Sequence, residues 1–213
     1  MPPDGFFGQR VMWGAFVLAV FGWGIGFYGP PIFLHALVDR GWPVTLASAA
    51  VTVHFLAGAL VVANLPALYG RFGLPAITKA AALAEGLGVC GWALAQTPWQ
   101  LFAAALLSGA GWVAMSAAAI NAILTPWFER KRPMALATAY NGASVGGVVF
   151  SPLWVAAIAQ FGFERATLLV AIIAAAVVWW LATSLFSKTP AKMGLHPDGA
   201  IETEIAGICG QEV

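Results

Sequence analysis

The residues that could do chemistry in this sequence are few, and they lie inside long apolar stretches. Glu85 and Lys79 are the only residues charged at pH 7 in six such stretches. An ionisable group at membrane depth costs at least ~2.5 kcal/mol on insertion scales, which makes it a candidate for function. Glu85 could couple the movement of a proton or cation, or it could be a protonated acid bonded to a neighbouring helix. Lys79 lies near the end of its stretch, where its side chain can reach the lipid headgroups.

Two histidines lie in the first two stretches. His54 is in the middle of residues 45–69, where a neutral imidazole can accept and release a proton near physiological pH. A core histidine bonded to a carbonyl is an equally good interpretation. His35 follows Pro30 and Pro31 near the end of the first stretch and is expected at the membrane interface. No pair of histidines has the spacing of metal ligands, so we expect no metal site.

Uncharged polar and aromatic residues give a second set of candidates. Asn121 and Asn141 can offer a donor and an acceptor to a polar substrate, or they can join helices to one another. Tyr28, Trp23 and Trp112 could form an aromatic wall for a small organic solute, although aromatic residues in membrane helices also serve packing.

One apparent cofactor motif is discarded. Gly24, Gly26 and Gly29 fit the spacing of a dinucleotide-binding loop, but no strand precedes them and they lie within an apolar stretch. We therefore expect no cofactor.

The composition excludes a soluble globular domain. Of 213 residues, 61% are hydrophobic and only 9% are charged, against roughly 25% charged in typical soluble domains. The net charge of +1 provides no field for nucleic acid. The composition therefore predicts a protein that lies in a lipid bilayer.

The lengths of the apolar stretches predict transmembrane helices. A bilayer core of about 30 Å needs roughly 20 apolar residues per helix. The stretches do not alternate between lipid-facing and lumen-facing residues as the strands of a barrel would. We predict an all-α integral membrane protein with six helices, at about 11–35, 45–69, 76–95, 99–125, 134–159 and 166–187.

Basic residues predict the orientation of these helices. Cytoplasmic connections of membrane proteins are enriched in lysine and arginine. Only Arg40 and Arg165 fall on one side of the predicted bundle. The other side carries Arg10, Arg71, Lys79, Arg130, Lys131, Arg132, Lys188 and Lys192. The N-terminal segment 1–10 and the tail 188–213 are therefore both expected in the cytoplasm.

A weak internal repeat relates the first three helices to the last three. Gly22-Trp23 recurs 89 residues later as Gly111-Trp112, and Phe72-Gly73 recurs at the same offset as Phe161-Gly162. Because a unit of three helices is odd, its second copy must enter the membrane upside down. The prediction is two inverted three-helix repeats, the arrangement of many secondary transporters.

Three segments together resemble a known family. They are Trp127 to Gly147 (WFERKRPMALATAYNGASVGG), the glycine-rich segment 22–31 (GWGIGFYGPP), and Gly194 to Gly199 (GLHPDG). The sequence is similar to the N-terminal six-helix half of a major facilitator superfamily transporter, on its monocarboxylate and oxalate/formate branch. The resemblance covers residues 4–199, and the tail 188–213 resembles the start of the family's central cytoplasmic loop.

This resemblance implies a function. It implies secondary active transport of a small organic solute, such as a monocarboxylate, by alternating access with proton coupling, and no enzymatic activity. It also implies a bacterial inner-membrane protein with both termini in the cytoplasm. Second, fourth and fifth helices of the family face the path, which favours His54, Asn121 and Asn141 as substrate-path residues beside Tyr28. The third helix is peripheral in the family, and Glu85 lies on it as the coupling candidate.

Two departures from the family leave alternatives open. Animal monocarboxylate carriers place a lysine in the first helix, and residues 11–35 contain none. Family members have twelve helices, so a missing second half or a homodimer is expected to complete the transporter. The alternative hypotheses are a six-helix membrane interaction or assembly protein and an inactive truncated transporter. A membrane enzyme would need a cluster of acid, base or metal-binding residues, which the sequence lacks.

Overall fold

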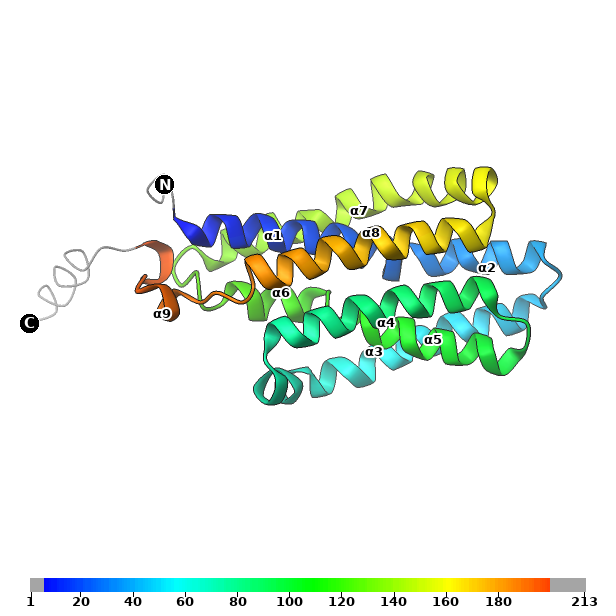
Figure 1. The fold of residues 1–213 in the computed structure, drawn as a ribbon, viewed down its shortest axis with the longest axis horizontal. Helices are drawn as coiled ribbons and strands as arrows, with labels where there is room; N and C mark the ends of the chain where they lie inside the picture. Colours follow the sequence, from blue (N-terminus) through cyan, green and yellow to red (C-terminus); the bar gives the residue numbers. More distant parts are fainter. Residues whose placement is uncertain (1–5, 200–213) are drawn as a thin grey trace, which may run out of the picture.

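The structure, a computed structural model, describes residues 6–199 as a bundle of long helices lying side by side (Figure 1). The first rod of the bundle is interrupted in its middle. It consists of α1 (Phe7–Gly22), a single π-helical turn η1 (Trp23–Phe27) and α2 (Gly29–Asp39).

The remaining rods follow through short connections. The fourth rod is also interrupted, between α5 and α6, and the chain closes with two short helical turns after α8. The elements are α3 (Val44–Phe72), α4 (Leu74–Leu94), α5 (Pro98–Val113), α6 (Ala117–Leu124), α7 (Arg132–Phe161), α8 (Phe163–Ser184), α9 (Pro190–Met193) and the 3₁₀ turn η2 (Pro197–Gly199).

The lengths and composition of the rods make this a multi-pass integral membrane protein of the all-α class. Five helical segments of residues 6–199 are long and apolar enough to cross a membrane. They are Phe7–Asp39, Val44–Phe72, Pro98–Leu124, Arg132–Phe161 and Phe163–Ser184. Helix α4 has 21 residues, a sufficient length, but it is not among the five because Lys79 and Glu85 make it less apolar.

Close packing between α1 and α7 depends on small residues. Gly142 and Gly146 of α7 face α1, and a Cβ atom on Gly146 would lie 2.6 Å from the carbonyl oxygen of Val20. A Cβ atom on Gly142 would overlap the carbonyl oxygen of Phe16. A Gly-x-x-x-Gly spacing allows such a close approach of two helices. On the other side of the bundle, α4 packs against both α5 and α8, and α3 packs against α5.

Two glycines make the tightest connections in the bundle. Gly73 joins α3 to α4 with φ 81° and ψ 151°, and Gly162 joins α7 to α8 with φ 79° and ψ 158°. Residues with a Cβ atom rarely adopt this backbone conformation, which explains glycine at both positions. The two residues are 89 positions apart, which is the offset of the predicted repeat.

We call the end of the bundle that carries the start of α1, the α3–α4 turn and α9 the terminal end, because the described part of the chain begins and ends there (Figure 1). The segment after α8 folds back over this end. The carboxylate of Asp198 accepts hydrogen bonds from the backbone N–H groups of Glu129, Arg130 and Lys131, the shortest at 2.7 Å. Its own N–H donates to the carbonyl of Trp127 at 2.9 Å. The segment is thereby attached to the connection between α6 and α7. Residues 1–5 and 200–213 of the expected terminal segments lie outside the described residues.

Candidate functional site

The π turn in the first rod is the centre of the candidate site. Its defining hydrogen bond runs from the N–H of Tyr28 to the carbonyl of Trp23, five residues earlier, at 2.9 Å. Such turns are rare and are frequently found at functional sites. Here the turn directs two carbonyls to other helices. Gly24 accepts from the indole Nε1 of Trp154 on α7 at 3.1 Å, and Gly26 bonds to Nε2 of His54 on α3 at 2.9 Å.

His54 is buried, with 1% of its surface exposed, and its second ring nitrogen is also bonded. Nδ1 lies 2.8 Å from the hydroxyl of Ser108 on α5, which accepts from the indole Nε1 of Trp92 at 3.0 Å. Because the Gly26 carbonyl can only accept, Nε2 carries a proton, and in the neutral imidazole Nδ1 accepts from Ser108. We call these residues the His54 network: His54, Ser108, Trp92 and Gly26.

Glu85 of α4 lies next to the same π turn. The side chain is 1% exposed, and its Oε1 atom is buried without a hydrogen-bond partner in residues 6–199. A Cβ atom on Gly26 would lie 2.6 Å from Oε1. A Cβ atom on Gly111 of α5 would overlap the backbone nitrogen of Glu85. Gly24 and Gly26 of the discarded dinucleotide motif therefore allow other helices to approach closely, and Gly26 lies next to both His54 and Glu85.

An aromatic face, formed by residues of η1, α3 and α5, covers the network. We define it as Trp23, Phe27, Phe55 and Trp112. The Trp112 ring is stacked on His54, with ring centroids 6.3 Å apart and an interplanar angle of 14°. Its indole Nε1 is buried and has no hydrogen-bond partner in the part of the chain that the structure describes. Phe27 is 44% exposed, so this face reaches the surface of the bundle. Aromatic walls with a few convergent polar groups are typical of sites for small organic molecules.

The other predicted path residues lie apart from the His54 network. The half-buried ring of Tyr28 packs on Gly147 of α7. A Cβ atom on Gly147 would lie 2.6 Å from Cζ of Tyr28. The amide of Asn121 on α6 donates to the hydroxyl of Tyr140 on α7, a contact of the helix-joining kind. Asn141 is exposed. Among the described residues, neither asparagine hydrogen-bonds to the His54 network or to Glu85.

The sequence analysis missed several members of the site. Ser108 has three polar neighbours: His54, Trp92 and the carbonyl of Ala105 at 3.2 Å. The only available signal was a hydroxyl in the stretch 99–125, which also contains Ser116 and Thr125, and hydroxyls are common in membrane helices. Trp92 and Trp154 carried no signal, because their roles depend on single N–H groups that reach across to other helices.

A comparison with protein families identifies the family of this chain. The sequence profile described as Major Facilitator Superfamily matches residues 11–204. The chain therefore belongs to the Major Facilitator Superfamily, whose members move solutes across membranes. A search of curated proteins gave no match.

Proposed function

We propose that this chain carries out secondary active transport of a small organic solute, such as a monocarboxylate, by alternating access coupled to protons. The observation that carries the proposal is the π turn of the first rod. It gathers a histidine, a carboxyl group and an aromatic face from four helices at one place. Membership of a transporter superfamily supports the class of function.

The proposed architecture is half of a transporter, with α4 as a sixth span and two inverted three-helix repeats. The matching backbone conformations at Gly73 and Gly162 support the repeat. So do the helix interruptions that follow Gly22-Trp23 and Gly111-Trp112. The proposal needs a second bundle, either a second half or a second copy of this chain. The large apolar side chains that α3 and α7 leave exposed, including Leu56, Leu60, Val148 and Val155, could contact either lipid or such a bundle.

We propose that Glu85 and His54 take part in proton coupling. Burial of an unpaired carboxylate is costly, so the surroundings of Glu85 favour the neutral acid until water or a cation reaches it. The His54 network can hold an additional proton without losing a partner. A protonated Nδ1 would donate to Ser108, and the Ser108 hydroxyl would turn to the carbonyl of Ala105.

The solute path in this proposal follows the aromatic face. Tyr28 lies next to Phe27 of that face, with ring centroids 5.2 Å apart. Asn121 and Asn141 would offer hydrogen bonds further along α6 and α7. The His54 network and the aromatic face contain no lysine or arginine. An anionic solute would therefore need a protonated His54 or a cation from the second bundle.

We propose that the terminal end faces the cytoplasm of a bacterial cell, across its inner membrane. Of the basic residues within 6–199, Arg10, Arg71, Lys188 and Lys192 lie at or near this end, as does the Arg130–Arg132 run. Such an excess is typical of cytoplasmic connections.

The test is uptake of ¹⁴C-lactate and ¹⁴C-oxalate by vesicles that contain only this purified chain. We expect saturable accumulation of one of these probes when the vesicle interior is made alkaline, and little accumulation without a proton gradient. His54→Ala should lower the accumulation, whereas His35→Ala, at an exposed position, should not. A folded, inserted chain that accumulates neither probe at any protein-to-lipid ratio would contradict transport by copies of this chain. That result would favour an interaction or assembly protein or an inactive truncated transporter.

A further inference from the structure

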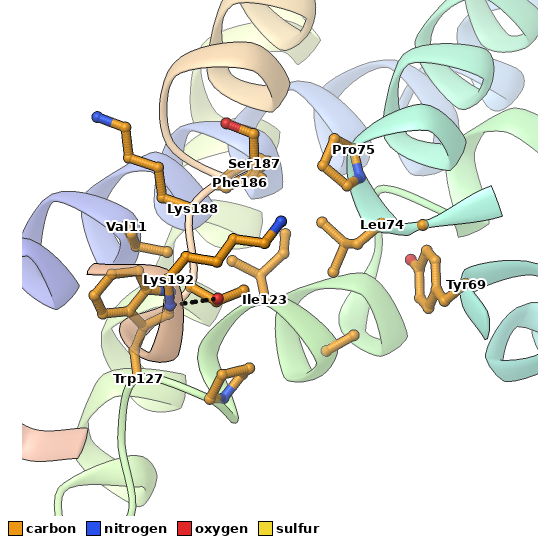
Figure 2. A pocket seen from close by; sticks show the side chains of 14 residues that line it. Val11, Tyr69, Leu74, Pro75, Ile123, Trp127, Phe186, Ser187, Lys188 and Lys192 are labelled. Carbon is orange, nitrogen blue, oxygen red and sulfur yellow. Dashed lines mark hydrogen bonds between the residues drawn. The ribbon is translucent and has the colours of Figure 1, made fainter. Parts of the chain in front are cut away.

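A second polar site lies at the terminal end of the bundle, away from the π turn. A partly open cavity of about 400 Å³ is lined there by α1, the α3–α4 turn, α6 and the segment that follows α8 (Figure 2). Most of its wall is apolar, formed by Val11, Leu74, Ile123, Trp127 and Phe186. An occupant must therefore present apolar surface as well as any charge.

The polar groups in this wall include two lysines and a tyrosine hydroxyl. The side chain of Lys192 extends between Trp127 and Leu74, whereas that of Lys188 turns away (Figure 2). The Lys188 ammonium lies 4.7 Å from the ring centroid of Phe7, at the edge of the cavity. The hydroxyl of Tyr69 is buried and has no hydrogen-bond partner in residues 6–199.

Nearby acidic groups do not neutralise these lysines within the described residues. The Asp198 carboxylate is occupied by the backbone N–H groups of the α6–α7 connection. The ion pair found in residues 6–199 joins Arg40 to Glu164 at the opposite end of the bundle. The cavity thus combines the ammonium group of Lys192 and the hydroxyl of Tyr69 with an apolar wall, and the ammonium group of Lys188 lies at its edge.

We propose that this cavity binds the phosphate headgroup of an anionic phospholipid. Ammonium and hydroxyl groups are donors to phosphate oxygens, and basic pockets between membrane helices are suited to lipid headgroups. The apolar wall favours a phosphate attached to a lipid over a free phosphate ion. A bound headgroup would connect Lys192 of α9 to Tyr69 of α3, and so fasten the segment after α8 to the α3–α4 turn. This inference does not depend on the proposed transport function.

The test is the thermal unfolding of the full-length chain in detergent, with phosphatidylglycerol or phosphatidylcholine added over a range of concentrations. We expect phosphatidylglycerol to raise the midpoint at lower concentrations than phosphatidylcholine. Inorganic phosphate and glycerol 3-phosphate form two further arms, and both should have little effect. An equal shift with inorganic phosphate would overturn the assignment to a lipid.

Two variants test whether phosphatidylglycerol binds in this cavity. Lys192→Ala removes an exposed ammonium, and Tyr69→Phe removes only the hydroxyl, so both variants are expected to fold. Each should weaken the apparent affinity for phosphatidylglycerol about five- to tenfold. Lys79→Ala is the matched control, because the Lys79 ammonium lies 4.9 Å from the ring centroid of Trp179 and does not line the cavity. An equal loss in Lys79→Ala, or no loss in Lys192→Ala and Tyr69→Phe, would overturn the proposal.

Discussion

The two interrupted rods of the bundle have similar sequences at their interruptions but different hydrogen bonds there. In each case a Gly-Trp pair lies at or just before the break, Gly22-Trp23 in the first rod and Gly111-Trp112 in the fourth. In the fourth rod, the hydrogen bonds at the break are made by residues of the same rod. The N–H groups of Ala114 and Ser116 donate to carbonyls three residues earlier, and the Ser116 hydroxyl donates to Val113 at 2.6 Å.

In the first rod, by contrast, side chains from other helices bond to the carbonyls at the break. His54 of α3 and Trp154 of α7 bond to the carbonyls of Gly26 and Gly24. Similar local sequence therefore produces a local kink in one rod and a junction of three helices in the other. We expect substitutions at the first interruption to affect the whole bundle, and substitutions at the second to have small effects.

His54→Ala should have the largest effect on stability. It leaves the Gly26 carbonyl and the Ser108 hydroxyl without their buried partner and opens a cavity. We expect the free energy of unfolding to fall by about 2–4 kcal/mol. The measurement is reversible unfolding in mixed micelles, followed by circular dichroism. His35→Ala is the matched control and should change the stability by less than about 0.5 kcal/mol. Equal effects of the two substitutions would remove the distinction between the interruptions.

Trp154→Phe tests the second side-chain contact to the π turn. Phenylalanine keeps an aromatic ring but removes the N–H group that donates to Gly24, so we expect a loss of about 1–3 kcal/mol in the same assay. Trp180→Phe, on the 60% exposed Trp180 of α8, should be nearly neutral. A neutral Trp154→Phe would mean that the turn does not need its link to α7.

A pair of serine substitutions compares the two regions directly. Ser108→Ala removes a hydroxyl that bonds to both His54 and Trp92 and should cost about 1–2 kcal/mol. Ser116→Ala removes a bond within its own turn and should cost less than about 0.5 kcal/mol. The reverse order of the two unfolding free energies would contradict the comparison.

The smallest predicted effects concern the proposed repeat. Gly73→Ala and Gly162→Ala each force a Cβ atom into a left-handed conformation, so each should lower the stability by about 1 kcal/mol, to the same extent. Gly70→Ala lies in α3 with no atom within 4 Å of the added Cβ and should be neutral or stabilising. Clearly unequal effects at Gly73 and Gly162 would argue against their equivalence.

Much of the fold was predictable because lipid imposes simple rules on a sequence. Apolar stretches of sufficient length predict membrane helices, and the all-α membrane class is confirmed by the structure and the family match. The π turn was not predictable, because its carbonyls are bonded by side chains 28 and 130 residues away in the sequence. The six-span count and the inverted repeat stay predictions.

Single residues of the candidate site were predictable from the sequence, but their arrangement in space was not. His54 and Glu85 were identifiable because ionisable groups in apolar stretches are costly and rare. Their meeting at Gly26 depends on how α3, α4 and the first rod pack, which no local pattern encodes. The Asn121–Tyr140 contact likewise joins two helices, and the roles of both asparagines in a solute path stay predictions.

The most direct test of proton-coupled transport compares two transport modes in the wild-type chain and in Glu85→Gln. Vesicles are loaded with unlabelled lactate for exchange against external ¹⁴C-lactate, or are given a proton gradient for net accumulation. Glutamine imitates the neutral acid but cannot release a proton. We expect Glu85→Gln to exchange lactate at close to the wild-type rate but no longer to accumulate it with the gradient. Accumulation equal to that of the wild type would contradict a coupling role for Glu85.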